Sequence, residues 1–153
     1  MIDLKNLNII LTGATGVIGN SILDKLISAG STVLATGTND EKLKIIKQKF
    51  KNLNVLKFDI SDHKNIDQFV ENCSSILSNK IDVLINNAGN NRPAHFTKVK
   101  TTDMEYMVKI NTIAAFNLAH LCVLKMIKSK NRKKNRWFYS QHVITNGSCW
   151  RAN

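Results

Sequence analysis

A glycine-rich turn near the N-terminus carries the first residues with a chemical role. The turn reads Thr12-Gly13-Ala14-Thr15-Gly16-Val17-Ile18-Gly19 and separates an apolar run from a segment with helical spacing. Glycine has no Cβ, so its backbone can turn tightly and approach a phosphate closely. The N-terminus of the following helix offers free N–H groups and a partial positive charge. The pattern predicts a pyrophosphate site, with a tight structural turn as the alternative for a motif this short.

A second motif, Asn86-Asn87-Ala88-Gly89, follows the apolar run at 81–85. An asparagine at the end of a strand can bond loose backbone groups and hold that strand beside a bound cofactor. A plain turn is the alternative interpretation of this motif when it is taken alone. Its occurrence at this distance from the glycine-rich turn favours a nucleotide-binding site.

Strand-like and helix-like segments alternate along the chain and would position these motifs. Apolar, β-rich runs lie at 7–11, 32–36, 55–58 and 81–85, and segments with helical spacing lie at 17–28, 40–51, 62–77 and 103–128. Such alternation predicts parallel βαβ units with right-handed crossovers. The predicted fold is α/β, a Rossmann-like doubly wound parallel sheet that ends after the fourth strand and the long helix.

Polar residues and one glycine mark where these helices begin and end. Gly30 stands where a helix C-cap glycine is expected. Asn39 or Asp40 can cap the second helix, and Ser61 or Asp62 can cap the third. In the fourth helix, a shared apolar face is predicted for Met107, Ile110, Ala114, Leu118 and Leu121.

Taken together, the motifs resemble those of the short-chain dehydrogenase/reductase family. The family's Thr-Gly-x-x-x-Gly-x-Gly turn corresponds to Thr12–Gly19, and its Asn-Asn-Ala-Gly is present as Asn86–Gly89. Asp59 matches the family's adenine-contacting Asp, and Asn111 matches the helical Asn of its catalytic tetrad. The resemblance covers about the first 128 residues and is strongest to the 3-oxoacyl-(acyl-carrier-protein) reductases, with the best local match at 33–43.

One position in the glycine-rich turn departs from the reductase pattern. Val17 stands where the family usually has glycine, while Gly16 is present. The resulting spacing is that of the family's longer, epimerase-like branch, although Asn86–Gly89 and Asn111 belong to the shorter reductase branch. We therefore expect the reductase assignment to hold and Val17 to crowd the cofactor.

The resemblance implies a nicotinamide cofactor and a set of residues that bind it. These are Gly13, Ala14, Thr15, Gly16, Ile18, Gly19, Thr38, Asp59, Ile60, Asn87, Ala88 and Gly89. Enzymes that use NAD hold the ribose hydroxyls with an acid, and no acid occupies Thr36, Gly37 or Thr38. This absence favours NADP over NAD, although no arginine stands there to bind a 2′-phosphate.

The same resemblance implies a substrate and an assembly. The similar reductases use NADPH to reduce a β-keto thioester carried on acyl-carrier protein, and the intact family forms homo-oligomers. Residues 90–95 differ from the sequence that these reductases have after the Asn-Asn-Ala-Gly motif. Another small carbonyl or sugar compound is therefore an alternative substrate. A non-catalytic NAD(P)-binding module is the alternative of a different class.

The family's catalytic Tyr-x-x-x-Lys pair is missing from the chain. Tyr139 is followed four residues later by Val143, and Tyr106 is followed by Ile110. A tyrosine in this family donates a proton, and the lysine lowers its pKa. Of the tetrad, Asn111 alone is accounted for. We therefore expect the chain to be an enzyme by family and catalytically incompetent as written.

The composition changes near Asn131, and the remaining residues are expected to be foreign to the predicted fold and not part of it. We predict an incomplete NAD(P)-binding domain at 1–130 and a non-native or disordered tail at 131–153. Read one base later, the codons of residues 137–144 allow Gly-Ser-Ile-Val-Asn-Met-Ser-Ser, which resembles the family's fifth strand. This indicates a frameshift near 134–136. Without that strand, the fourth strand is expected to form an exposed edge of the sheet.

The composition of the chain indicates its cellular environment and which kinds of partner it is expected to lack. The 153 residues carry a formal net charge of +11, with a basic run at 128–136. No aromatic residues are interleaved with that run, so a solvated surface is favoured over nucleic-acid binding. The cysteines and histidines lack metal-ligand spacing, and no metal is predicted. No apolar run approaches the roughly 20 residues of a membrane span. A reducing cytoplasm is the expected location.

Overall fold

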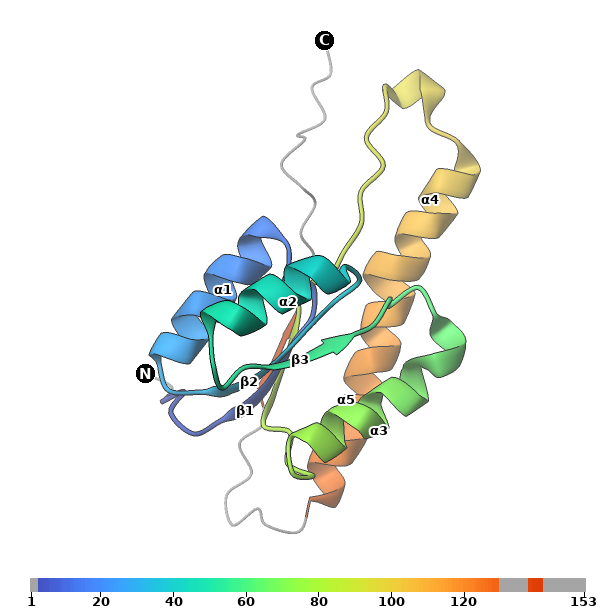
Figure 1. The fold of residues 1–153 in the computed structure, drawn as a ribbon. Helices are drawn as coiled ribbons and strands as arrows, with labels where there is room; N and C mark the ends of the chain where they lie inside the picture. The colour runs from blue at the N-terminus through green and yellow to red at the C-terminus, as the bar shows by residue number, and fades with distance from the viewer. Residues whose placement is uncertain (1–2, 130–137, 142–153) are drawn as a thin grey trace.

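The computed structural model describes residues 3–129 and 138–141 of the chain, which form a parallel sheet flanked by helices (Figure 1). The strands are β1 (Asn8–Leu11), β2 (Thr32–Gly37), β3 (Asn54–Lys57), β4 (Val83–Asn86) and β5 (Phe138–Gln141). They lie in the order β3-β2-β1-β4-β5, and every pairing is parallel. The order reverses direction between β1 and β4, which confirms the predicted doubly wound α/β sheet.

The helices connect successive strands and cover both faces of the sheet. They are α1 (Val17–Ser28), α2 (Asp40–Lys49), α3 (Ile66–Ile76), α4 (Thr101–Val108) and α5 (Ala115–Lys128), with short helical segments η1 (His63–Asn65), η2 (Phe96–Lys98) and η3 (Lys109–Ala114). In Figure 1, α1 and α2 lie on one side of the strands, whereas α3 and α5 lie on the other.

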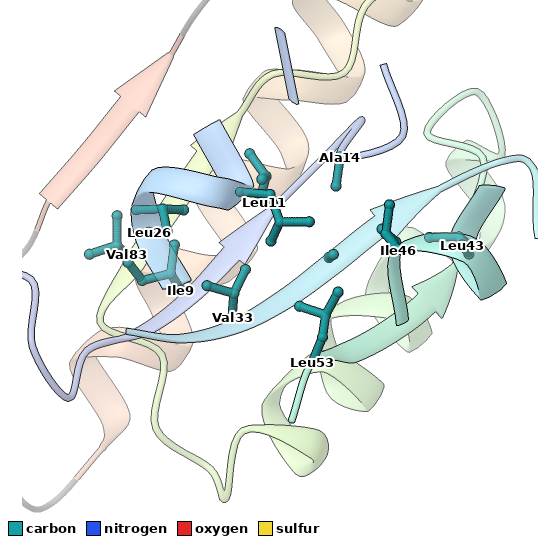
Figure 2. Close-up of a cluster of buried hydrophobic side chains, with 11 residues drawn as sticks. Ile9, Leu11, Ala14, Leu26, Val33, Leu43, Ile46, Leu53 and Val83 are labelled. Carbon is teal, nitrogen blue, oxygen red and sulfur yellow. The ribbon is translucent and has the colours of Figure 1, made fainter. Parts of the chain in front are cut away.

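Alternating side chains of the central strands build the two halves of the core. Ile9 and Leu11 face the α1–α2 side, where they pack with Leu26 and Ile46 (Figure 2). Ile10, between them, faces the opposite side with the buried residues of α3 and α5. Successive side chains of a strand point to opposite faces, so a strand covered on both faces must be apolar throughout. This explains the uninterrupted apolar runs in the sequence.

The structure confirms two of the predicted helix ends and corrects a third. Gly30 has φ +79° directly after the C-cap residue of α1, a conformation that glycine adopts without a steric cost. Asn39 caps α2, where its side-chain oxygen accepts from the backbone N–H of Lys42 at 2.9 Å. The expected cap of the third helix at Ser61 or Asp62 is wrong. Asp62 instead precedes the short segment η1, and α3 begins only at Ile66.

The long helix predicted from 103 to 128 is divided by a wide turn. The segment η3, Lys109–Ala114, has π-helical bonding between α4 and α5. A π turn adds a residue relative to an α turn and rotates the chain that follows. The buried stripe accordingly runs through Ile110, Ala114, Leu118, Cys122 and Met126. Leu121, predicted on the apolar face, is only partly buried.

The same helix meets a length and composition test for crossing a membrane. Among the described residues, Thr101–Lys128 contains a window with mean hydropathy 1.5, although no uninterrupted apolar run is present. Leu118, Cys122 and Met126 on this helix are buried in one cluster with Phe69 and Val70 of α3. One side of the helix is therefore packed into the protein core.

A fifth strand lies within the segment that was expected to be foreign to the fold. The backbone of β5 pairs with β4 in a parallel register, from Val83 opposite Phe138 to Asn86 opposite Gln141. The expectation that the fourth strand forms an exposed edge is therefore wrong, because its free side is bonded by β5. The rest of the predicted tail, including most of the basic run, lies outside the described residues, and the division of the chain at 130 stays a prediction.

Candidate functional site

A cavity of about 490 Å³ opens at the carboxyl end of the sheet. Its walls come from the turn after β1, the ends of β2, β3 and β4, and the helix formed by α4 and η3. In open α/β sheets, ligands bind in the crevice where the strand order reverses. The cavity lies at that point, between the segments that follow β1 and β4.

Most of the predicted cofactor-binding residues line this one cavity. They are Gly13, Thr15, Gly16, Ile18, Gly19, Thr38, Asp59, Ile60, Asn87, Ala88 and Gly89. Ala14 is the exception, because its methyl group is fully buried in the core and its N–H donates to Thr36 O. The fold thus brings together four segments that are far apart in the sequence.

The glycine-rich turn is as tight as its composition predicts, but only at two of its glycines. Gly13 has φ +64°, and a Cβ there would lie 2.8 Å from Ala88 Cα. A Cβ on Gly19 would lie 2.1 Å from the carbonyl oxygen of Gly13. At Gly16 the nearest such atom, the same oxygen, is 3.4 Å away. Gly13 and Gly19 therefore let α1 and the β4 segment approach the turn, whereas Gly16 leaves room.

The buried hydroxyl of Thr12 connects the two motifs. Its oxygen accepts hydrogen bonds from the backbone N–H groups of Asn87 at 3.0 Å and Ala88 at 2.9 Å. In return, Asn87 Nδ2 donates to the carbonyl oxygens of Thr12 at 2.9 Å and Gly13 at 3.1 Å. Thr12 is 1 % exposed, so water does not replace these bonds. The network fixes the segment after β4 against the glycine-rich turn.

Two features of this network suit a bound ligand with phosphate and hydroxyl groups. Asn87 is 7 % exposed, and its Oδ1 has no hydrogen-bond partner because the amide nitrogen faces the two carbonyl groups. Gly16 is the N-cap residue of α1, and no side chain caps this helix. The first N–H groups of a helix have no partner within the helix and carry a partial positive charge. The residues that line the cavity thus include one with an unpartnered acceptor and the uncapped start of a helix.

The opposite end of the cavity is formed by the ends of β2 and β3. A Cβ on Gly37 would lie 2.8 Å from Thr15 Oγ1, so β2 passes close to the glycine-rich turn here. Phe58 stacks on Phe69 of α3, with ring centroids 4.0 Å apart and planes inclined by 9°. Next to it, Asp59 accepts a hydrogen bond from the N–H of Ser61 at 2.8 Å. These contacts set the positions of the aromatic and acidic groups on this wall.

Asn111, the predicted catalytic residue, lies in η3 and is not on the cavity wall. Its side chain bonds the backbone of Asn90, which does line the cavity. Asn111 is therefore placed to hold the wall in position. The Ser, Tyr and Lys of the tetrad have no counterpart among residues 3–129 at the expected sequence spacing.

An arginine in the loop after β4 contacts two residues of α4, at the edge of the cavity. Arg92 pairs with Asp103 at 2.6 Å, and its guanidinium lies 3.9 Å from the ring centroid of Tyr106. The hydrogen bond to Asp103 raises the pKa of Arg92 above its usual value. Tyr106 and Ile110 both line the cavity. The sequence offered no signal for these two residues, since only the fold brings α4 and η3 over the ends of the strands.

Val17, which was expected to crowd the cofactor, lines the cavity. Its side chain is 89 % exposed at the start of α1. The expected crowding stays a prediction. Other wall residues that the motifs did not indicate are Thr36, Gly37, Phe58 and Asn90.

Comparison with known sequences decides the family. A model of the short-chain dehydrogenase family matches residues 7–133, which is most of the chain. The chain belongs to the short-chain dehydrogenase family. The glycine-rich turn, the Asn87 segment and Asn111 all lie inside the matched region.

Two curated relatives of the chain carry the same name. It is 32 % identical over 126 residues to a 3-oxoacyl-(acyl-carrier-protein) reductase of Aquifex aeolicus, covering 79 % of this chain and 50 % of the relative. It is 34 % identical over 122 residues to the reductase of that name in Buchnera aphidicola, covering 78 % and 49 %. The chain thus spans about half the length of the curated relatives it matches.

Solved structures of short-chain dehydrogenases share the fold. One from Streptomyces avermitilis superposes with a TM-score of 0.73 at 21 % identity, covering 79 % of this chain and 44 % of that one. A double mutant of a Serratia marcescens short-chain dehydrogenase/reductase superposes with a TM-score of 0.71 at 22 % identity. This match covers 82 % of this chain and 53 % of that one. At these identities the similarity supports the sheet topology and nothing finer.

Proposed function

We propose that the chain is the cofactor-binding part of an NADP(H)-dependent short-chain reductase of the cytoplasm. The observation that carries the proposal is a single cavity that gathers the glycine-rich turn, Thr38, Asp59 and the Asn87 segment. The pyrophosphate would lie at the start of α1, where uncapped N–H groups favour an anion. Asn87 Oδ1, which has no partner, would accept a hydrogen bond from a hydroxyl or amide of the ligand.

The preference for NADP over NAD rests on the end of β2. Thr36, Gly37 and Thr38 line the cavity without a carboxylate, and an acid at this place would bind ribose hydroxyls and repel a 2′-phosphate. The nicotinamide ring, when bound, supplies the hydride. The protein's own residues orient the dinucleotide and hold the loop beside it.

The proposed substrate is a β-keto thioester carried on acyl-carrier protein. The curated relatives are named for this reaction, at 32 % and 34 % identity. Because the chain spans about half of each, the substrate, the partner protein and assembly into a homo-oligomer are proposals for the complete protein. A different small carbonyl or sugar substrate is the second candidate, since residues 90–95 differ from the sequence of these reductases.

We further propose that this chain binds the cofactor without turning it over. Catalysis in this family needs a proton donor tuned to the working pH. Neither Tyr106 nor Tyr139 has a lysine four residues later, and the side chain of Asn111 is engaged with Asn90. A non-catalytic NAD(P)-binding module is therefore the alternative function of this chain.

Cofactor binding and turnover can be measured separately in the purified chain. Titration with NADPH, followed by its fluorescence, is expected to show saturable binding that is tighter than binding of NADH. Absorbance of NADPH in the presence of an acetoacetyl thioester is expected to stay constant with this chain and to fall with a variant in which the reading frame after residue 134 is corrected. Failure to bind either dinucleotide would overturn the assignment, and turnover by the present chain would overturn its catalytic incompetence.

A further inference from the structure

An ion pair brackets the turn between β2 and α2, at the end of the cavity formed by β2 and β3. Lys57, the last residue of β3, pairs with Asp40, the first residue of α2. In the sheet register, Lys57 lies directly opposite Gly37, and the N–H of Phe58 donates to Gly37 O at 3.0 Å. Gly37 and Thr38 line the cavity, and the ion pair adjoins them through the sheet register and the sequence.

Asp40 is an acid close to the place where this site is expected to have none. It follows Thr38 by two residues, at the start of a helix whose first turn also holds Glu41 and Lys42. The formal charges of Glu41 and Lys42 cancel, and both residues are exposed. The charge state that a 2′-phosphate would meet therefore depends on whether the carboxylate of Asp40 is neutralised.

We propose that Lys57 determines cofactor preference by neutralising Asp40, which lets the site accept a 2′-phosphate. This inference rests on the proposed function and deepens it by naming the residues that set the NADP preference. Lys57 acts here through Asp40, because its ammonium group is paired with that carboxylate and the residue is not on the cavity wall.

The size of the effect is limited by solvent. The side chains of Lys57 and Asp40 are 56 % and 54 % exposed, so their interaction with a nearby phosphate is weakened by water and salt. For a doubly charged phosphate and a carboxylate roughly 8 Å apart in water, Coulomb's law gives a change in affinity of about sixfold before screening by salt. The ion pair contributes little to stability at this exposure, so variants that remove it are expected to fold.

Dissociation constants for NADPH and NADH, measured by fluorescence titration of the full chain at low ionic strength, test the proposal. Lys57→Gln is expected to weaken NADPH binding several-fold, up to about sixfold, and to leave NADH binding unchanged, because only NADPH carries the 2′-phosphate. Asp40→Asn is expected to tighten NADPH binding. The double variant is expected to have the wild-type ratio of the two dissociation constants, since it contains neither an unpaired carboxylate nor an unpaired ammonium group at these positions.

A second ion pair on the same helix supplies the matched control. Lys49, the last residue of α2, pairs with Asp24 of α1 at 2.7 Å and is similarly exposed. Lys49→Gln removes the same charge from the far end of α2 and is expected to change the NADPH to NADH ratio less than Lys57→Gln. A double variant as weak for NADPH as Lys57→Gln would show that Lys57 binds the phosphate itself and would overturn the proposal. Equal effects of Lys57→Gln on both cofactors would also overturn it, whereas absence of binding in the wild-type chain would reject the proposed function instead.

Discussion

Asn111 and Asn90 bond each other in a reciprocal pair across the edge of the cavity. Asn111 Oδ1 accepts from the N–H of Asn90, and Asn111 Nδ2 donates to Asn90 O, both at 2.8 Å. Asn111 lies in the wide π turn of the long helix, whereas Asn90 follows directly after the Asn86–Gly89 motif. The pair satisfies both backbone groups of Asn90 and ties the loop after β4 to the helix. Asn111 therefore has a structural function that does not depend on the rest of a catalytic tetrad.

Replacing Asn111 by Ala is expected to lower the free energy of unfolding by about 1–2 kcal/mol, because two hydrogen bonds are lost at a partly exposed site. Urea unfolding followed by far-ultraviolet circular dichroism measures this change. Thr112→Ala removes an exposed side chain from the same turn and is expected to have little effect. Equal stability of the two variants would show that the reciprocal pair contributes nothing.

The buried hydroxyl of Thr12 gives a second test of how the motifs are joined. Thr12→Val keeps the shape of the side chain but leaves the N–H group of Ala88 without its acceptor, whereas the N–H of Asn87 retains Ile85 O at 3.1 Å. An unsatisfied buried donor costs about 1–3 kcal/mol, and with the second N–H losing one of its two acceptors we expect a loss of about 2–3 kcal/mol. Thr12→Ser keeps the acceptor and is expected to cost only about 1 kcal/mol for the missing methyl group. Chemical unfolding of the two variants compares these values, and a serine variant as unstable as the valine variant would assign the effect to packing.

Two glycines of the same turn are expected to respond differently to alanine. Gly19→Ala would place a Cβ 2.1 Å from Gly13 O and 2.9 Å from Asn87 Nδ2, so the backbone of the turn must move. We expect this variant to lose more than the roughly 1–3 kcal/mol of ordinary overpacking and to lose NADPH binding. Gly16→Ala meets Gly13 O at 3.4 Å with φ −78° and is expected to fold normally. Thermal unfolding and NADPH titration of both variants measure these effects. Normal folding with full NADPH binding by Gly19→Ala would show that the turn has room for a Cβ at this position.

The sequence predicted those parts of the site that depend on local chemistry. Gly13 and Gly19 were identified because a turn without room for a Cβ requires glycine, and Asn87 because its amide suits loose backbone groups at a strand end. Tyr106 and Ile110 could not be found in this way. They reach the cavity only because the long helix crosses the ends of the strands, and nothing in their local sequence records that contact.

Two features of the fold also differed from the sequence pattern for physical reasons. A uniform α-helix was expected from 103 to 128, because apolar residues at spacings of three and four do not distinguish an α turn from a single π turn. The strand Phe138–Gln141 was missed because its residues follow a change in composition and show no strand periodicity. Parallel pairing with β4 depends on backbone groups, which every residue except proline provides in full.

The buried thiols of Cys73 and Cys122 make the stability of the protein sensitive to alkaline pH. Burial raises the pKa of Cys73, with a further contribution from Cys122, and burial raises the pKa of Cys122 from 9.0 to about 12. Below pH 9 both thiols are protonated in the folded and the unfolded chain, so their contribution to stability is fully present. Above pH 9 the unfolded chain releases these protons while the folded chain retains them, and the free energy of unfolding decreases as the pH rises toward 12.

Each thiol is expected to contribute a slope of up to about 1.4 kcal/mol per pH unit in this window. Urea unfolding at a series of pH values between about 8 and 11 measures the slope. Cys73→Ala combined with Cys122→Ala is expected to be less stable at neutral pH, because both side chains fill the core between α3 and α5, but to decline less steeply above pH 9. All other side chains are common to both proteins, so their contributions cancel in the comparison. Parallel pH profiles for the wild-type chain and the double variant would mean that the thiols are accessible to water and that α3 and α5 are not packed as the structure shows.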